Sequence, residues 1–90
     1  MYRLKFHEKA LKDFEKIAKP YQILIKEKLL ILSENPKVLA NQITRLKGTQ
    51  DEPLYRLRVG SYRVIFFKKF EELIIIIIRI GYRKDVYEGF

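Results

Sequence analysis

The sequence predicts a small α+β domain in which an N-terminal strand and an α-helical hairpin precede a three-stranded antiparallel meander with a short C-terminal tail. Three patterns lead to this prediction. Apolar and charged residues alternate over 2–6 and 54–66, apolar residues recur at helical spacing from 10 to 32, and an isoleucine-rich run fills 73–80. With 90 residues, the chain has room for one domain, spanning 1–90.

The first two elements are a strand and a helix. Apolar residues at 2, 4 and 6 alternate with Arg3 and Lys5, which predicts a half-buried strand. After His7 the period changes, and apolar residues at 10, 11, 14, 17 and 18 share one face of an amphipathic helix. His7 lies at the junction, where a capping or packing role is expected.

Pro20 ends the first helix and suits the first turn of the next one. Apolar positions 21, 24, 25, 29 and 32 extend the second helix to about Leu32 or Glu34, before Pro36. Two helices with so short a connection are expected to form an antiparallel hairpin. Residues 36–53 follow as a long irregular connection.

A β-hairpin is predicted next, with strands at about 54–59 and 62–69. Gly60-Ser61 suits a two-residue loop, which places Arg58 opposite Arg63. Because side chains alternate along a strand, the arginines and the apolar residues separate onto opposite faces. One face carries Arg56, Arg58 and Arg63, and the other carries Leu57, Val59, Tyr62 and Val64.

The last strand is expected at 73–80, after a turn at 70–72. It is apolar on both faces, which places it at the centre of the sheet with helices on one side. Arg79 interrupts this run. A basic, aromatic tail then covers 82–87.

Charge and composition narrow the class of partner. Nineteen lysines and arginines against eleven acidic residues give a formal charge of +8, which predicts attraction to nucleic acid, an acidic protein or an anionic membrane surface. A thermophile-like surface explains abundant charge but not the excess of one sign.

Cysteine and an apolar signal segment are absent, and the apolar run 73–78 falls far short of the ~20 residues that span a bilayer. We therefore expect a cytoplasmic protein with no membrane partner.

The arginines on the predicted hairpin are the strongest candidate site. Two arginines directly opposite in a ladder repel each other by roughly a few tenths of a kcal/mol or more. A guanidinium group binds phosphate through two parallel hydrogen bonds, so a bound polyanion would offset this repulsion. The alternative is an ordinary solvated sheet face, and the opposition of Arg58 and Arg63 favours binding over it.

The tail adds tyrosines and further cations. In single-stranded RNA recognition, bases stack on aromatic rings while cations hold the phosphates, and the sequence Tyr82-Arg83-Lys84-Asp85-Val86-Tyr87 has both components. The alternative interpretation is that Tyr82 and Tyr87 pack as a small cap on the sheet.

The candidate chemistry needs neither metal nor cofactor. No cluster with metal-ligand spacing and no glycine-rich phosphate loop occurs in the sequence. RNA carries its own nucleophile, the 2′-hydroxyl, so a nuclease need only orient it, stabilise the crowded phosphate and move two protons. Tyrosine and lysine have reference pKa values of about 10 and would need nearby positive charge to act as a base.

Three motifs together resemble those of the RelE/ParE toxin superfamily of toxin–antitoxin systems: Leu46-Lys47-Gly48, the hairpin 55–65, and the segment 80–87. The resemblance covers nearly the whole chain in order. It implies a compact, microbial-RNase-like α+β fold. It further implies a RelE-like toxin that cleaves mRNA in the ribosomal A site, inhibits translation, and is inhibited by a RelB-like, acidic antitoxin. The toxin–antitoxin complex is expected to be heterotetrameric and to bind DNA through the antitoxin.

The resemblance also assigns roles to individual residues. Arg63 matches the arginine that stabilises the scissile phosphate, Arg83 the tail arginine needed for toxicity, and Tyr87 the tyrosine that acts on the 2′-hydroxyl or stacks a base. These three are the expected catalytic residues. The expected RNA-binding residues are Lys47, Arg56, Arg58, Tyr82 and Lys84. Some relatives have lysines at 56 and 58, and many have histidine at 82.

The leading hypothesis is therefore a ribosome-dependent, metal-independent endoribonuclease. One alternative is a ParE-like protein that poisons DNA gyrase by binding, without nuclease activity. Another is a catalytically weak homologue that survives as an antitoxin-binding and corepressing module.

Overall fold

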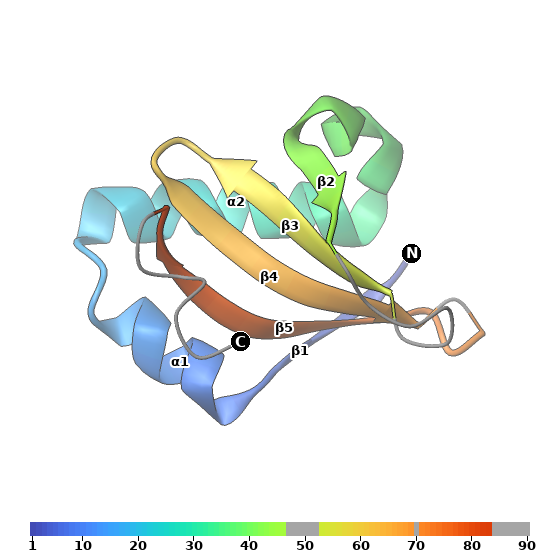
Figure 1. Cartoon of the computed structure of the whole chain (residues 1–90), viewed down its shortest axis with the longest axis horizontal. Helices are drawn as coiled ribbons and strands as arrows, with labels where there is room; N and C mark the ends of the chain where they lie inside the picture. The colour runs from blue at the N-terminus through green and yellow to red at the C-terminus, as the bar shows by residue number, and fades with distance from the viewer. Residues whose placement is uncertain (47–52, 70, 84–90) are drawn as a thin grey trace.

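The computed structural model describes residues 1–46, 53–69 and 71–83 and contains one five-stranded sheet. The strands lie in the order β1-β5-β4-β3-β2, with α2 crossing behind the sheet and α1 beside β5 (Figure 1). The elements are β1 (Arg3–Phe6), α1 (Glu8–Glu15), α2 (Lys19–Glu34), the 3₁₀ helix η1 (Pro36–Gln42), β2 (Ile43–Arg45), β3 (Leu54–Val59), β4 (Tyr62–Lys69) and β5 (Ile74–Tyr82). The predicted α+β class is confirmed.

The strand β5 occupies the interior position that its apolar sequence predicts. It pairs in parallel with β1, from Arg3 opposite Ile74 to Phe6 opposite Ile77, and antiparallel with β4. It also runs two residues further than predicted, to Tyr82. Leu73, predicted as its first residue, instead lies in the preceding turn with a φ of 53° and an exposed side chain.

The hairpin of β3 and β4 has the predicted register. Arg58 lies opposite Arg63, Leu57 opposite Val64 and Val59 opposite Tyr62. Gly60, the first loop residue, has a φ of 59°, a left-handed conformation that glycine adopts without steric cost. This turn therefore fixes which side chains share each face.

The prediction of an irregular connection over 36–53 was wrong for its first part. Residues 36–42 form η1, and the three residues of β2 extend the sheet by pairing with β3, with Ile43 opposite Leu57 and Arg45 opposite Tyr55. A three-residue strand is too short to show an alternating pattern, and its conformation depends on the free edge of β3. The remainder, 47–52, lies outside the described residues.

The first helix is shorter than its apolar pattern predicts. It ends at Glu15, and in a tightened last turn the N–H of Lys16 donates to the carbonyl of Asp13 and the N–H of Ile17 donates to the carbonyl of Phe14. Pro20 lies in the first turn of α2, as predicted, so the chain must turn before it. His7 caps α1, as expected, because its Nδ1 accepts a hydrogen bond from the N–H of Lys9 at 3.2 Å.

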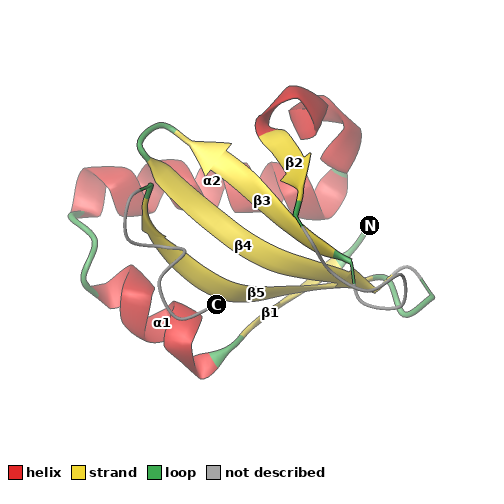
Figure 2. Ribbon diagram, viewed as in Figure 1, coloured by secondary structure: helices red, strands yellow, loops and turns green. Residues whose placement is uncertain are grey.

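The two helices contact each other, since Nε2 of Gln22 on α2 donates to the carbonyl oxygen of Phe14 on α1 at 2.8 Å, and each helix also packs against other elements. The helix α1 contacts β5, whereas α2 contacts η1 and β3 (Figure 2). The core lies between the helices and one face of the sheet, and its fully buried members include Ala10, Ile25, Leu57, Val64, Ile75 and Ile77. None of the described helices is long and apolar enough to cross a membrane.

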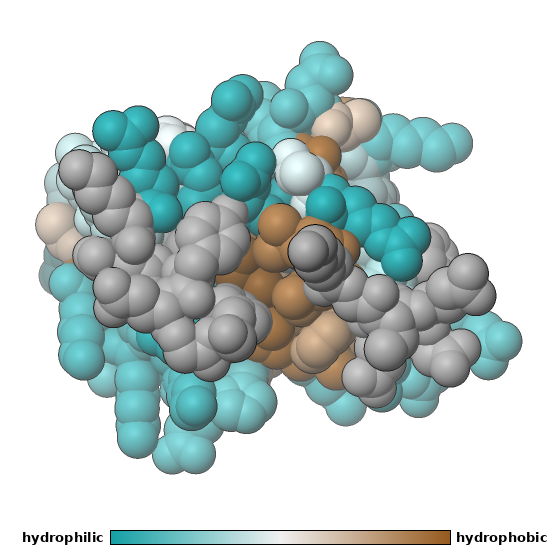
Figure 3. Space-filling view, viewed as in Figure 1, coloured by the Kyte–Doolittle hydropathy of each residue, from teal (hydrophilic) through white to brown (hydrophobic). Residues whose placement is uncertain are grey.

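The opposite face of the sheet is partly apolar. Figure 3 shows an apolar area on the side of the molecule turned away from α2. Ile65 and Ile74 are buried but lie outside the main core cluster, and they sit on the same strands that carry the arginines. Arg58 and Arg63 lie near the Gly60 turn, whereas Arg56 is the cross-strand partner of Ile65, where the apolar area begins.

Replacing Gly60 with alanine should destabilise the protein without any steric clash. A β-carbon at this position meets no atom within 4 Å, so the cost of about 1–2 kcal/mol comes from the positive φ alone. Ser61→Ala is the matched control in the same loop, since Ser61 has no positive φ. Urea unfolding of both variants measures the difference, and equal stabilities would contradict this view of the turn.

Candidate nucleic-acid interface

Arg56, Arg58 and Arg63 form a patch at the turn end of the hairpin, which we call the arginine face. Arg58 and Arg63 are direct partners across β3 and β4, and Arg56 lies two residues before Arg58 on the same face. Arg58 is exposed, whereas Arg56 and Arg63 are half-buried. The structure thus brings together the three arginines that the alternation predicts.

Hydrogen bonds to the protein orient two of these guanidinium groups. Nη1 of Arg63 donates to the carbonyl oxygens of Gly60 at 2.8 Å and Tyr62 at 2.9 Å. Nη2 of Arg56 donates to Oγ1 of Thr44, on β2, at 3.2 Å. A planar guanidinium that is already oriented loses less entropy when it binds phosphate.

The end of β5 lies directly beside the turn that joins β3 to β4 and beside the start of β4, which carries Arg63. Gly81 is the cross-strand partner of Arg63, and the N–H of Arg83 donates to the carbonyl of Ser61 at 2.9 Å. Arg83 itself is exposed. Arg63 and Arg83, which stand twenty positions apart in the sequence, therefore belong to one surface.

Three tyrosines pack in a row at the same end of the sheet, on the face opposite to the arginines. The rings of Tyr62 and Tyr82 meet edge-to-face with centroids 5.6 Å apart, and Tyr21 of α2 packs on Tyr62 at 5.2 Å. Tyr82 remains 44% exposed, so part of its ring is available for stacking while the rest packs on the sheet. The packing interpretation of Tyr82 is thus confirmed, and stacking of a base on its exposed part stays a prediction.

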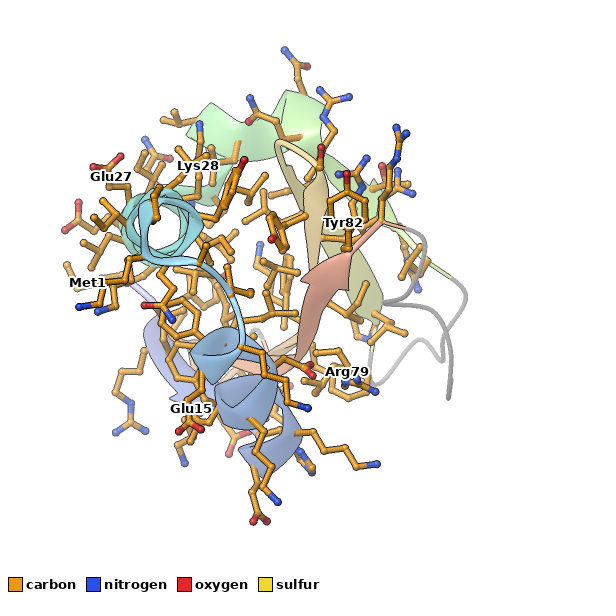
Figure 4. The ribbon with its side chains drawn as sticks, turned by 90° about the vertical axis from the view of Figure 1, so that its left-hand side faces the viewer. Met1, Glu15, Glu27, Lys28, Arg79 and Tyr82 are labelled. Carbon is orange, nitrogen blue, oxygen red and sulfur yellow. The ribbon has the colours of Figure 1, made fainter. Side chains whose placement is uncertain are left out.

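An ion pair that the sequence patterns did not reveal supports this end of β5. Arg79 donates from Nε to Oδ2 of Asp13 at 2.8 Å and from Nη2 to Oδ1 at 3.2 Å, and the N–H of Ile80 donates to Oδ2 at 3.0 Å. Figure 4 shows Arg79 beside the end of α1 and Tyr82 further along β5. The hydrogen bond to Asp13 raises the pKa of Arg79, against partial desolvation and with the help of charge attraction.

The sequence contained one signal of this ion pair. Arg79 interrupts an otherwise apolar central strand, and a charge in such a position needs a partner. The partner could not be deduced, because Asp13 lies 66 positions away on another element.

Three predicted site residues, Lys47, Lys84 and Tyr87, lie outside the described residues.

A family model described as "ParE toxin of type II toxin-antitoxin system, parDE" matches residues 4–87. The chain belongs to the RelE/ParE toxin superfamily. The match extends over every described helix and nearly every described strand residue, so it includes both the arginine face and Arg83.

Sequence and structure comparisons within this superfamily agree. The chain is 32% identical over 88 residues to a protein named mRNA interferase toxin RelE from Escherichia coli (strain K12), covering 96% of this chain and 90% of that protein. It resembles the toxin in the archaeal RelE–RelB complex from Pyrococcus horikoshii with a TM-score of 0.78 and 30% identity, over 94% of this chain and 98% of that one. A chain of the intact E. coli RelBE toxin–antitoxin complex gives a TM-score of 0.69 and 30% identity, over 91% of this chain and 96% of that one.

Asp13→Ala should destabilise this toxin by about 2 kcal/mol, because it removes hydrogen bonds to Arg79 and Ile80 and leaves a half-buried guanidinium unpaired. In a double-mutant cycle with Arg79→Ala, the coupling energy should be about 1 kcal/mol. The matched control on the same helix is Glu8→Ala, since the Glu8–Lys12 pair at 3.6 Å is highly exposed and should add little. Additive effects of Asp13→Ala and Arg79→Ala would show that the pair does not stabilise the fold.

Proposed function

We propose that this chain is the toxin of a type II toxin–antitoxin system and that it cleaves mRNA in the ribosomal A site, which inhibits translation. The observation that carries the proposal is the juxtaposition of Arg63 and Arg83, joined through the Arg83–Ser61 backbone hydrogen bond at the turn of the hairpin. Its support from relatives is the 32% identity to the E. coli protein named mRNA interferase toxin RelE.

The arginine face would act by binding and stabilising the scissile phosphate. During attack by the 2′-hydroxyl, negative charge increases on the phosphate oxygens, and fixed donors aimed at this charge lower the barrier. Arg63 would supply such donors from the strand, and Arg83 from the end of β5. Arg56 and Arg58 would hold the neighbouring phosphates and keep the RNA in place.

Proton transfer requires a different residue. Arginine stays protonated in proteins and cannot act as a base. On the family resemblance we assign this step to Tyr87, with Tyr82, Lys47 and Lys84 binding RNA around it. The reaction would yield a 2′,3′-cyclic phosphate or a 3′-phosphate, and because arginines supply the charge stabilisation we propose that it needs no metal ion.

An antitoxin partner is supported by the solved relatives, which include complexes of RelE with RelB. With a formal charge of +8, this chain should attract an acidic, amphipathic segment that covers apolar surface and masks basic residues. We propose a cytoplasmic, heterotetrameric complex that binds DNA through the antitoxin, and a free toxin whose partners are the ribosome and mRNA.

A second candidate function is binding to DNA gyrase. It is favoured by one observation, the match to a family model described as a ParE toxin. The two functions differ in a measurable product: cleaved mRNA in one case, and gyrase-dependent DNA breaks in the other.

Purified toxin added to ribosomes with a defined A-site codon should cut the mRNA in that codon. Arg63→Ala and Arg83→Ala should each lower the cleavage rate by about 100-fold, since each removes a preorganised donor from the phosphate. The matched control is Arg3→Ala, an exposed arginine of β1 opposite Ile74, at the far end of β5. Primer extension on the mRNA measures the rates.

Two results would contradict the proposed nuclease. In one, wild-type toxin leaves the mRNA intact, and gyrase-dependent DNA breakage would then favour the second candidate. In the other, Arg83→Ala and Arg3→Ala cleave at equal rates. Circular dichroism of each variant separates loss of activity from loss of folding, which matters for Arg63 because it bonds to the turn carbonyls.

A further inference from the structure

A pocket of about 450 Å³ lies at the edge of β5, on the side of α1. Its described lining comes from α1 and the two residues near its end, from β4 and from β5: Asp13, Lys16, Ile17, Tyr62, Arg79, Ile80, Gly81 and Tyr82. Known ligand sites have volumes of about 300–1,000 Å³. The pocket is thus large enough for one nucleotide.

The topology of the sheet creates this pocket. The strand β1 pairs with β5 only as far as Ile77, so within the described part of the chain the later residues of β5 have no strand neighbour on that side. Asp13 takes the place of such a neighbour at one position, where it accepts the N–H of Ile80. Because α1 ends at Glu15, no described residue fills the space between Asp13 and Tyr82.

The lining combines aromatic surface with an excess of positive charge. The rings of Tyr62 and Tyr82 form one wall, and the apolar side chains of Ile17 and Ile80 add to it. Lys16 and Arg79 against one carboxylate, Asp13, leave one net positive charge. A planar base attached to a phosphate matches these two properties, because bases stack on tyrosine and cations hold the phosphate.

The pocket adjoins the arginine face. Gly81, part of its lining, is the cross-strand partner of Arg63, and paired strands are only about 5 Å apart. Arg63 and Tyr82 lie on opposite faces of the sheet, and an RNA strand with a phosphate on Arg63 can pass over Gly81 and around the edge of β5 to place its next nucleotide at Tyr82.

We propose that this pocket is a nucleotide subsite, which receives the RNA nucleotide adjacent to the phosphate bound at the arginine face. The base stacks on Tyr82, and Lys16 and Arg79 bind its phosphate. Asp13 orients Arg79 through the two hydrogen bonds described above. The inference rests on the proposed RNA substrate, and it assigns an RNA-binding role to Lys16, at the end of α1.

Titration of the ¹⁵N-labelled toxin with adenosine 5′-monophosphate tests the subsite without ribosomes. Amide signals of Lys16, Gly81 and Tyr82 should shift, and ribose 5-phosphate, which lacks the base, should bind at least about tenfold more weakly. Tyr82→Leu should weaken binding of the nucleotide by about tenfold or more. Tyr82→Phe, which keeps the ring, should bind it nearly as well as the wild type.

Lysines on α1 and at its end provide the matched pair of variants. Lys16→Ala should weaken binding by roughly two- to fivefold, whereas Lys12→Ala, outside the pocket and near Glu8, should not change it. The proposal is overturned if the three amides do not shift, if ribose 5-phosphate binds equally well, or if Tyr82→Leu binds as the wild type does. Nucleotide binding without mRNA cleavage would instead contradict the proposed nuclease and leave the subsite in place.

Discussion

The register of the β3–β4 hairpin is the constraint on which the candidate site depends. A shift by one residue would turn the arginines toward the core and the apolar residues toward water, because side chains alternate along a strand. The buried side chains of Leu57 and Val64 on the inner face oppose such a shift, and the Gly60 turn fixes the pairing at the other end. Burial on one face thus holds Arg58 and Arg63 together on the other, despite their repulsion.

The second constraint lies where β1 ends. Beyond Ile77, β5 no longer pairs with β1. There Asp13 instead accepts hydrogen bonds from the side chain of Arg79 and from the backbone N–H of Ile80. This contact ties α1 to the part of β5 that leads to Tyr82 and Arg83. Among the described residues no strand covers the edge of β5 beyond this contact, so one topological feature explains both the support of the arginine face and the pocket beside it.

Features set by residues close together in the sequence could be predicted, whereas features set by pairing between distant segments could not. The hairpin, its register and the arginine face follow from the Gly60-Ser61 loop and the alternation around it, and His7 capping follows from its place at a strand–helix junction. The strand β2 has three residues, too few for a period, and the parallel pairing of β1 with β5 joins segments about 70 positions apart without any local pattern. The Asp13 partner of Arg79 was hidden for the same reason. The roles of Lys47, Lys84 and Tyr87 still rest on the resemblance, since they lie outside the described residues.

In the proposed mechanism the arginines bind and stabilise the phosphate, and the nucleophile is the 2′-hydroxyl of the RNA itself. The most direct measurement is cleavage of a ribosome-bound mRNA in which the nucleotide 5′ to the cut carries a 2′-deoxyribose. The proposed mechanism predicts that the toxin still binds the ribosome but leaves that mRNA intact, while it cuts the all-ribose mRNA to a 2′,3′-cyclic phosphate or 3′-phosphate. Cleavage of the deoxy-substituted mRNA at the same bond would contradict the proposed mechanism.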